Sequence, residues 1–168
     1  MNSDISELIK ESMKLELLVS DLYTVFYKSF PDDKDFWWRL VLEEKNHAAL
    51  FRSGLDSEEV GIKFPENLVL QELDTLKIAN ADLKKMIDDF NLMPPTRKEA
   101  FNIALELENS AVEIHYQQFM ENGAESAIDR IFQELNKADK DHAARIRAYM
   151  EEHQIPFDEQ NLYIETES

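Results

Sequence analysis

Apolar residues recur along this chain at spacings of three and four positions, which is typical of amphipathic α-helices packed on one face. The periodicity predicts four long helices, over residues 4–29, 33–53, 96–121 and 125–152. Short connections join the first helix to the second and the third to the fourth, so each pair is expected to form an antiparallel hairpin. The chain has only 3 glycines in 168 residues, a composition that suits long helices and disfavours a β architecture.

Local signals mark several ends of these helices. Thr96 with Glu99 has the spacing of a capping box, and so has Asp4 with Glu7. Gly54 follows the second predicted helix and is expected to end it.

Residues 54–95 separate the two hairpins, and their apolar spacing predicts one or two further helices rather than a plain loop. The predicted fold class is therefore all-α: a four-helix bundle over residues 1–152, built from two antiparallel helical hairpins joined by a long helical crossover. Residues 153–168 form an acidic tail, which is short of apolar residues after Pro156 and expected to be loose.

Charge and composition disfavour several classes of function. The net charge of −17 argues against nucleic acid or an anionic membrane as a partner. The sequence contains no cysteine, which excludes disulfides, iron–sulfur clusters and thiol nucleophiles. It has neither an apolar run long enough to span a membrane nor an N-terminal signal-peptide pattern, so we expect a cytoplasmic location.

Two carboxylate-x-x-histidine pairs carry the candidate chemistry. Glu44 lies three residues before His47 in the second helix, and Asp139 lies three before His142 in the fourth. Residues three apart share a helix face, so each pair can offer an oxygen and an imidazole nitrogen to one metal ion.

The helix faces strengthen this signal, because a chain with 35 acidic residues contains such pairs by chance. Each hairpin also carries an acid on its first helix, Glu16 or Glu108, at a similar distance upstream. The positions one and two turns from Glu44 are apolar: Trp37, Leu40, Val41, Ala48 and Phe51. Neighbouring acids such as Glu43 and Glu106 lie on more polar faces and are expected to contact water.

Several carboxylates on apolar helix faces need a source of positive charge, because burying an unpaired carboxylate costs several kcal/mol or makes it protonate. Divalent cations would remove both the repulsion and the cost of burial. The alternative is that these acids pair with His47, His142 or an inward-reaching Lys or Arg. Taken together with the hairpin spacing, the acids favour a metal centre.

The chain resembles the ferritin-like superfamily, and most closely the erythrin domain of rubrerythrin-type proteins. The resemblance covers residues from about 5 to 150 and rests on the segments 16–23, 42–48, 104–108 with Tyr116, and 138–143. It implies two iron ions, although manganese or zinc would suit similar ligands. By resemblance, one ion takes Glu16, Glu44 and His47, and the other takes Glu108, Asp139 and His142. Glu44 and Glu108 would bridge the two, with Tyr23 and Tyr116 beside the metal-binding carboxylates.

The sequence departs from the family at three points. Asp139 stands where the family usually has Glu, so the second metal is expected to bind differently, more weakly or not at all. Ala111 replaces an additional glutamate of rubrerythrins, which puts their peroxidase cycle in doubt. A Cys-rich rubredoxin domain is missing, so electrons would come from a separate donor.

The resemblance implies a homodimer and an oxidoreductase, either a peroxidase or a ferroxidase, that reacts with peroxide or O2 or oxidises Fe(II) in oxidative-stress or iron handling. One alternative is a metal-binding protein without turnover. Another is a bundle that has lost one or both metals and acts as an interaction module. His115 is expected to be a core histidine hydrogen-bonded to a carboxylate, and His153 a surface residue. Trp37 and Trp38 are expected to be packing residues rather than a redox relay.

Overall fold

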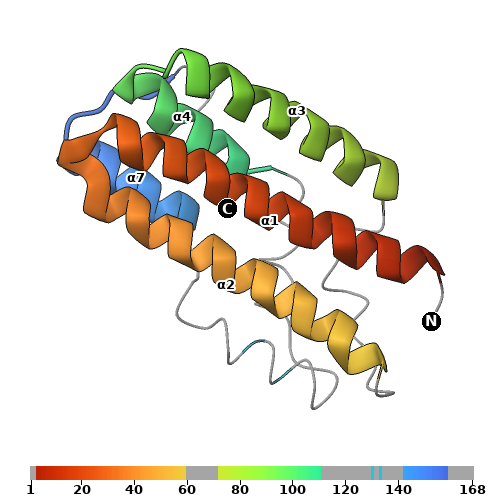
Figure 1. Cartoon of the computed structure of the whole chain (residues 1–168). Helices are drawn as coiled ribbons and strands as arrows, with labels where there is room; N and C mark the ends of the chain where they lie inside the picture. Colours follow the sequence, from red (N-terminus) through yellow and green to blue (C-terminus); the bar gives the residue numbers. More distant parts are fainter. Residues whose placement is uncertain (1–2, 60–71, 111–129, 131–132, 134–141, 159–168) are drawn as a thin grey trace.

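The computed structural model describes residues 3–59, 72–110, 130, 133 and 142–158. Within these ranges the chain is helical and contains no strand, which confirms the all-α prediction. The elements are α1 (Ser3–Ser29), the 3-10 turn η1 (Pro31–Asp33), α2 (Lys34–Glu59), α3 (Leu73–Leu92), α4 (Arg97–Glu108) and α7 (His142–Glu152). Figure 1 shows them side by side, with their long axes close to one direction.

Helices α1 and α2 form the antiparallel hairpin that the sequence predicts (Figure 1). Pro31 cannot continue α1 and instead begins η1, which turns the chain directly into α2. Midway along the pair, the Ser20 hydroxyl donates to the carbonyl oxygen of Val41 at 3.2 Å. The buried faces of both helices meet in one apolar core, which includes Leu22, Phe26 and Trp37.

Two helix ends differ from the prediction. Helix α2 runs to Glu59, beyond the predicted end at Ser53, because Gly54 lies within the helix rather than after it. Helix α4 begins as predicted, with the capping box of Thr96 and Glu99 formed in both directions. It ends at Glu108, however, where Asn109 leaves the helical conformation, whereas the sequence predicted one helix to residue 121. The predicted start of the last helix near residue 125 lies outside the described residues, and its predicted end at Glu152 is confirmed.

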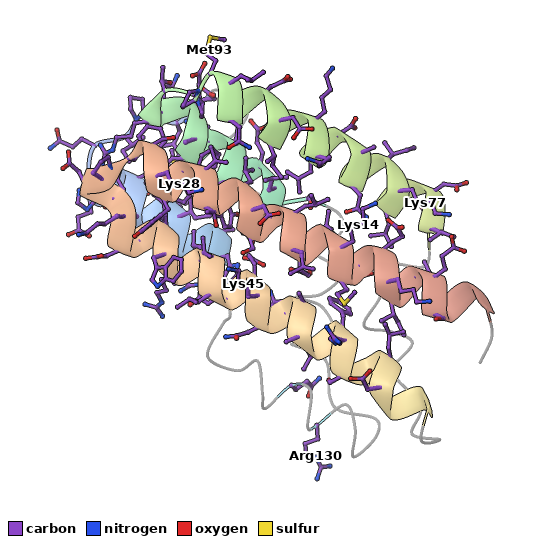
Figure 2. The ribbon with its side chains drawn as sticks, in the orientation of Figure 1. Lys14, Lys28, Lys45, Lys77, Met93 and Arg130 are labelled. Atoms are coloured by element: carbon purple, nitrogen blue, oxygen red, sulfur yellow. The ribbon has the colours of Figure 1, made fainter. Side chains whose placement is uncertain are left out.

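The predicted crossover contains α3, a helix of 20 residues that packs along α1 (Figure 1). Asn80 is buried in this contact, and its amide donates to the backbone oxygen of Glu11 at 3.0 Å. Lys77 extends the contact with an exposed ion pair to Glu7 (Figure 2). The helical crossover is therefore confirmed over residues 73–92.

A buried carboxylate joins η1, α4 and α7 at one end of the molecule. Arg97 donates to both oxygens of Asp33, from Nε and Nη2, each at 2.8 Å. The hydroxyl of Tyr149 donates to the same carboxylate at 2.9 Å. These contacts lower the pKa of Asp33 in spite of its burial, which acts to raise it. We call this group the Asp33 cluster.

The start of the C-terminal tail is held against α4, contrary to the expectation that it is loose. The amide of buried Asn102 donates to the carbonyl oxygen of Pro156 at 2.9 Å, and its oxygen accepts from the backbone of Asp158 at 2.8 Å. Lys98 adds an ion pair to the Asp158 side chain. Residues 159–168 lie outside the described ranges. Among the helices described, none is both long and apolar enough to cross a membrane.

Candidate metal centre

Two groups of buried acids and histidines lie where α1, α2, α4 and α7 meet. Each offers three ligand atoms that lie within 4.8 Å of one another. Glu16, Glu44 and His47 make the first group, and Glu44, Glu108 and His142 make the second. Glu44 belongs to both, so the groups are halves of one centre, which we call the carboxylate–histidine centre.

In the first group, α1 and α2 bring their ligand residues together across the hairpin. His47 follows Glu44 by one helical turn, and its Nδ1 lies 3.1 Å from Glu44 Oε2. The same nitrogen lies 3.5 Å from Glu16 Oε2 on α1. Trp37, Leu40, Val41, Ala48 and Phe51 are all buried around this face of α2, as the sequence predicts.

In the second group, His142 lies on α7 and faces acids from two other helices. Its Nδ1 lies 2.8 Å from Glu44 Oε1 and 3.3 Å from Glu108 Oε2. The rings of His47 and His142 are stacked, with centroids 5.3 Å apart. Each imidazole therefore faces a different oxygen of Glu44: His47 faces Oε2, and His142 faces Oε1.

The five side chains are almost completely shielded from water, with exposed fractions of 1–3% for Glu16, Glu44, His47, Glu108 and His142. Among the described residues, the ion pairs of the three acids all involve one of the two histidines. Lys14, Lys28 and Lys45, which lie on α1 and α2, are exposed (Figure 2). Within the described part of the chain, three carboxylates therefore face two imidazoles.

Burial and the pairing of acids with imidazoles shift the pKa values of the centre in opposite directions. Burial raises the pKa of Glu16 to about 7, although His47 opposes that effect. Burial would also raise the pKa of Glu44, but the imidazoles of His142 and His47 outweigh it and lower that pKa. Burial alone would lower the pKa of each histidine, yet the surrounding carboxylates raise both pKa values well above the usual range.

Two carboxylate oxygens in the centre make no hydrogen bond. Glu16 Oε2 and Glu44 Oε1 are both buried without a hydrogen-bond partner, although each faces an imidazole nitrogen. A buried carboxylate oxygen normally finds a donor, so an unsatisfied one requires an explanation. Oxygen atoms left free beside imidazole nitrogens are the ligand set that suits Fe, Mn or Zn ions. The residues present fit a metal ion in each half of the centre.

Tyr23 closes the centre on the side of Glu108. Its hydroxyl is buried on α1 and donates to Glu108 Oε1 at 2.5 Å. This leaves Glu108 Oε2, the atom that faces His142, as the oxygen available for a cation. Such an outer hydrogen bond fixes the orientation of a ligating carboxylate.

Glu43 lies beside the centre and is buried, whereas the sequence interpretation placed it wrongly on the water-facing side of α2. It is 6% exposed, and its oxygens accept from Arg145 Nη1 at 2.9 Å and Nη2 at 2.6 Å. Arg39 adds a contact at 3.0 Å, and His142 Nε2 lies 3.4 Å from Glu43 Oε2. Glu43 thus contacts the nitrogen of His142 that faces away from the ligand group. The sequence signal was Arg39, one turn before Glu43, but Arg145 comes from a distant helix.

The other candidate residues divide into two sets. Asp139, Tyr116, His115 and Asp141 lie outside the described residues. Glu106 and His153 are exposed, as expected.

An apolar pocket of about 180 Å³, open to the surface, lies between α1, α3 and α4. Leu15 and Val19 line it on the turn of α1 that carries Glu16, and Leu107 lines it next to Glu108 in the sequence.

No family model, curated protein or solved structure matches this chain. Buried Glu and His side chains that can hold a metal ion are therefore what the molecule itself shows of its function.

Proposed function

We propose that this protein is a rubrerythrin-like dimetal-carboxylate protein with a ferritin-like four-helix bundle, and that its carboxylate–histidine centre holds two iron ions. In this proposal Glu16, Glu44 and His47 hold one ion, and Glu44, Glu108 and His142 hold the other, joined by Asp139. The reaction is with peroxide or O2, or the oxidation of Fe(II). The protein would act as a homodimer in oxidative-stress or iron handling.

The observation that carries the proposal is the position of Glu44. One oxygen of this carboxylate faces His47 and the other faces His142, at 3.1 and 2.8 Å. A carboxylate held between two nitrogen ligands in this way is placed to bridge two cations. A pairing of acids with histidines alone would not need two oxygens without hydrogen bonds.

Bound iron would supply the redox chemistry, and the chain supplies the positions of the ligands. Burial of the five side chains excludes bulk water and strengthens every charge interaction within the centre. The Tyr23 hydroxyl donates its proton in a hydrogen bond to Glu108 Oε1, beside the atoms that would hold the metal. Glu43 and Arg145 keep the His142 ring in place from behind.

Metal content tests the proposal directly. The protein is purified from iron-supplemented cells and its metals are measured by elemental analysis, beside His47→Ala and His142→Ala variants. His153→Ala is the matched control, because His153 is exposed at the end of the helix that carries His142. We expect about two irons per chain in the wild type and the control, as a di-iron bundle requires, and a loss in both other variants.

The same samples separate the alternatives. One metal that is lost only with His47 would show that Asp139 has weakened the second half. Stoichiometric iron without steady-state consumption of peroxide or O2 would favour a metal-binding protein without turnover. Absence of metal from every sample would overturn the proposal in favour of an interaction module.

A further inference from the structure

We propose that Tyr23, Trp37, Phe101 and Tyr149 form an aromatic relay that carries single electrons from the protein surface to the carboxylate–histidine centre. The inference deepens the proposed function and rests on it for the identity of the electron acceptor. It names the route by which an external one-electron reductant would reach a centre that is sealed from water. The relay itself is a property of the chain and can be tested without metal.

The inner end of the relay contacts the centre directly. Tyr23 is completely buried, and its hydroxyl donates to Glu108. Its ring lies 5.7 Å from the ring of Trp37, measured between centroids. Tyrosine and tryptophan are the side chains most easily oxidised by one electron in a chain without cysteine. The first redox-active ring outside the centre thus has a second one beside it.

Trp37 is the redox-active residue in the middle of the relay. It is completely buried, and its indole N–H has no hydrogen-bond partner. A buried indole N–H usually finds an acceptor, so this one departs from normal core packing. With no acceptor in the described part of the chain, an oxidised Trp37 keeps its proton, and only an electron has to move. This makes it suited to transient oxidation between two tyrosines.

The outer end runs through a stack of rings to the surface. Phe101 lies 4.4 Å from Trp37 and 5.4 Å from Tyr149, and its ring is nearly parallel to that of Tyr149, at 7°. Phe36 makes a second path, 5.4 Å from Trp37 and 4.1 Å from Tyr149. The phenylalanine rings are too hard to oxidise to hold the charge themselves, so they only connect the tryptophan to the tyrosine. Tyr149 is only partly buried and stacks on exposed His153 at 4.0 Å.

Each tyrosine of the relay faces a proton acceptor. Oxidation of a phenol by one electron releases its proton, so a buried tyrosine needs a base within hydrogen-bond distance. Tyr23 has Glu108, and Tyr149 has Asp33 at 2.9 Å. Tyr27, in contrast, packs on exposed Trp38, and no described carboxylate accepts a hydrogen bond from it.

The electron balance of one pass is simple. If oxidised iron were bound in the centre, it would accept one electron from Tyr23, and the phenolic proton would move along the hydrogen bond to Glu108 Oε1. Tyr23 regains an electron from Trp37 and its proton from Glu108, and Trp37 regains an electron from Tyr149, whose proton passes to Asp33. An external one-electron reductant then refills Tyr149, which takes its proton back. Peroxide or O2 is the final oxidant, as the proposed function requires.

The test uses the full chain without metal, labelled with a ruthenium photosensitiser on His153. This histidine is exposed, whereas His47 and His142 are buried, and a His153→Gln variant controls for labelling elsewhere. After a laser flash with an oxidative quencher, the sensitiser takes an electron from Tyr149. We expect the transient visible absorption of an oxidised tryptophan in the wild type, and its loss in Trp37→Phe and in Tyr149→Phe. Trp38→Phe is the matched control and should keep the signal.

The outcomes are decisive in both directions. A signal that persists in Trp37→Phe, or one that disappears in Trp38→Phe, would overturn the relay. Thermal unfolding of each variant shows whether a lost signal reflects a lost fold. Phe26→Leu serves as a second control, because Phe26 contacts Trp37 at 5.0 Å but is neither a redox-active ring nor a bridge to Tyr149, and its loss should leave the signal intact.

A second measurement connects the relay to the centre. In iron-loaded protein oxidised once with peroxide, reduction by ascorbate should be slower in Trp37→Phe than in the wild type at equal iron content. Equal rates would show that electrons enter by another route. A protein that binds no iron would refute the proposed function and leave the flash result standing.

Discussion

Two buried groups of carboxylates in this molecule differ in whether the chain supplies the charge that they need. In the Asp33 cluster, one carboxylate receives two donors from Arg97 and one from Tyr149. In the carboxylate–histidine centre, three carboxylates face only two imidazoles, and two of their oxygens have no donor. The pKa of Asp33 is lowered, whereas that of Glu16 is raised to about 7. The first group is paired by donors from the described part of the chain, and the second has the ligand atoms to hold a metal ion.

Glu43 and Glu44 repeat this contrast at adjacent positions. Both are buried on α2, but Glu43 is held by Arg145 and Arg39, while the ion pairs of Glu44 are with imidazoles. A buried acid near the centre is therefore not by itself a ligand. What marks Glu44 is that its ion pairs in the described ranges include no guanidinium or ammonium group.

The largest expected effect is the loss of metal from Glu44→Gln. Because Glu44 belongs to both halves of the centre, we expect this variant to lose metal from both, as measured by elemental analysis. Glu43→Gln is the matched control at the next position. It should keep the ligands and weaken metal affinity by about 10–100-fold, the usual effect of a group behind a ligating histidine. If the two variants lost metal equally, the distinction between the two acids would fail.

Added metal should stabilise the wild type. Fe(II) or Mn(II) at about one hundred times its dissociation constant is expected to raise the free energy of unfolding by about 2.7 kcal/mol, by mass action. Chemical denaturation with and without metal, under anaerobic conditions for Fe(II), measures the change. Glu44→Gln should show no such increase, and His153→Ala should behave like the wild type. A wild type that metal leaves unchanged would mean that the centre tolerates its charge shortage.

Removal of the Asp33 charge should destabilise the protein without affecting metal content. Hydrogen bonds to a charged group contribute about 1.5–3 kcal/mol, and Asp33→Asn would leave Arg97 without its partner. We therefore expect a loss of about 2 kcal/mol in the free energy of unfolding at neutral pH, measured by urea denaturation.

The same variant carries a pH test. Since the folded pKa of Asp33 is lowered, its contribution is complete above the unfolded value of about 3.9 and is lost as the pH falls through the folded pKa. The difference between wild type and Asp33→Asn should therefore narrow below about pH 4. A difference that stayed constant through this range would contradict the charged role of Asp33.

The smallest expected effect is that of Tyr149→Phe. This change removes one of the three donors to Asp33 and keeps the aromatic ring in its stack. We expect a loss of about 1 kcal/mol in the free energy of unfolding, which is typical of a single hydrogen bond. Equal losses in Tyr149→Phe and Asp33→Asn would show that Arg97 contributes little to the cluster.

Local patterns in the sequence predicted the parts of this molecule that depend on neighbours along one helix. Apolar spacing predicted α1 to its last residue, and the capping box of Thr96 and Glu99 predicted the start of α4. The spacing of Glu44 and His47 predicted that both lie on the buried face of α2. These features depend on helix geometry, which repeats every few residues and needs no knowledge of the fold.

The helix ends and the tail show where this local information stops. Gly54 lies inside α2 because a single glycine costs only about 1 kcal/mol in a helix, which packing can offset. Asn102 holds residues 156 and 158 by contacts across more than fifty positions of sequence. The spacing of apolar residues along one helix cannot predict such contacts, because they join positions that are far apart in the sequence.

The sequence by itself determined the all-α class, the register of the buried helix faces and a set of acids and histidines with metal-ligand spacing. Only the tertiary structure decided which partner each buried acid has. Glu44 lies between His47 and His142, and Glu43 is paired with Arg145, which lies 102 positions further along the chain. Glu108 accepts a hydrogen bond from Tyr23. The physical reason is that the charges around a buried carboxylate determine its pKa and its role. Those charges come from helices that meet only when the chain folds.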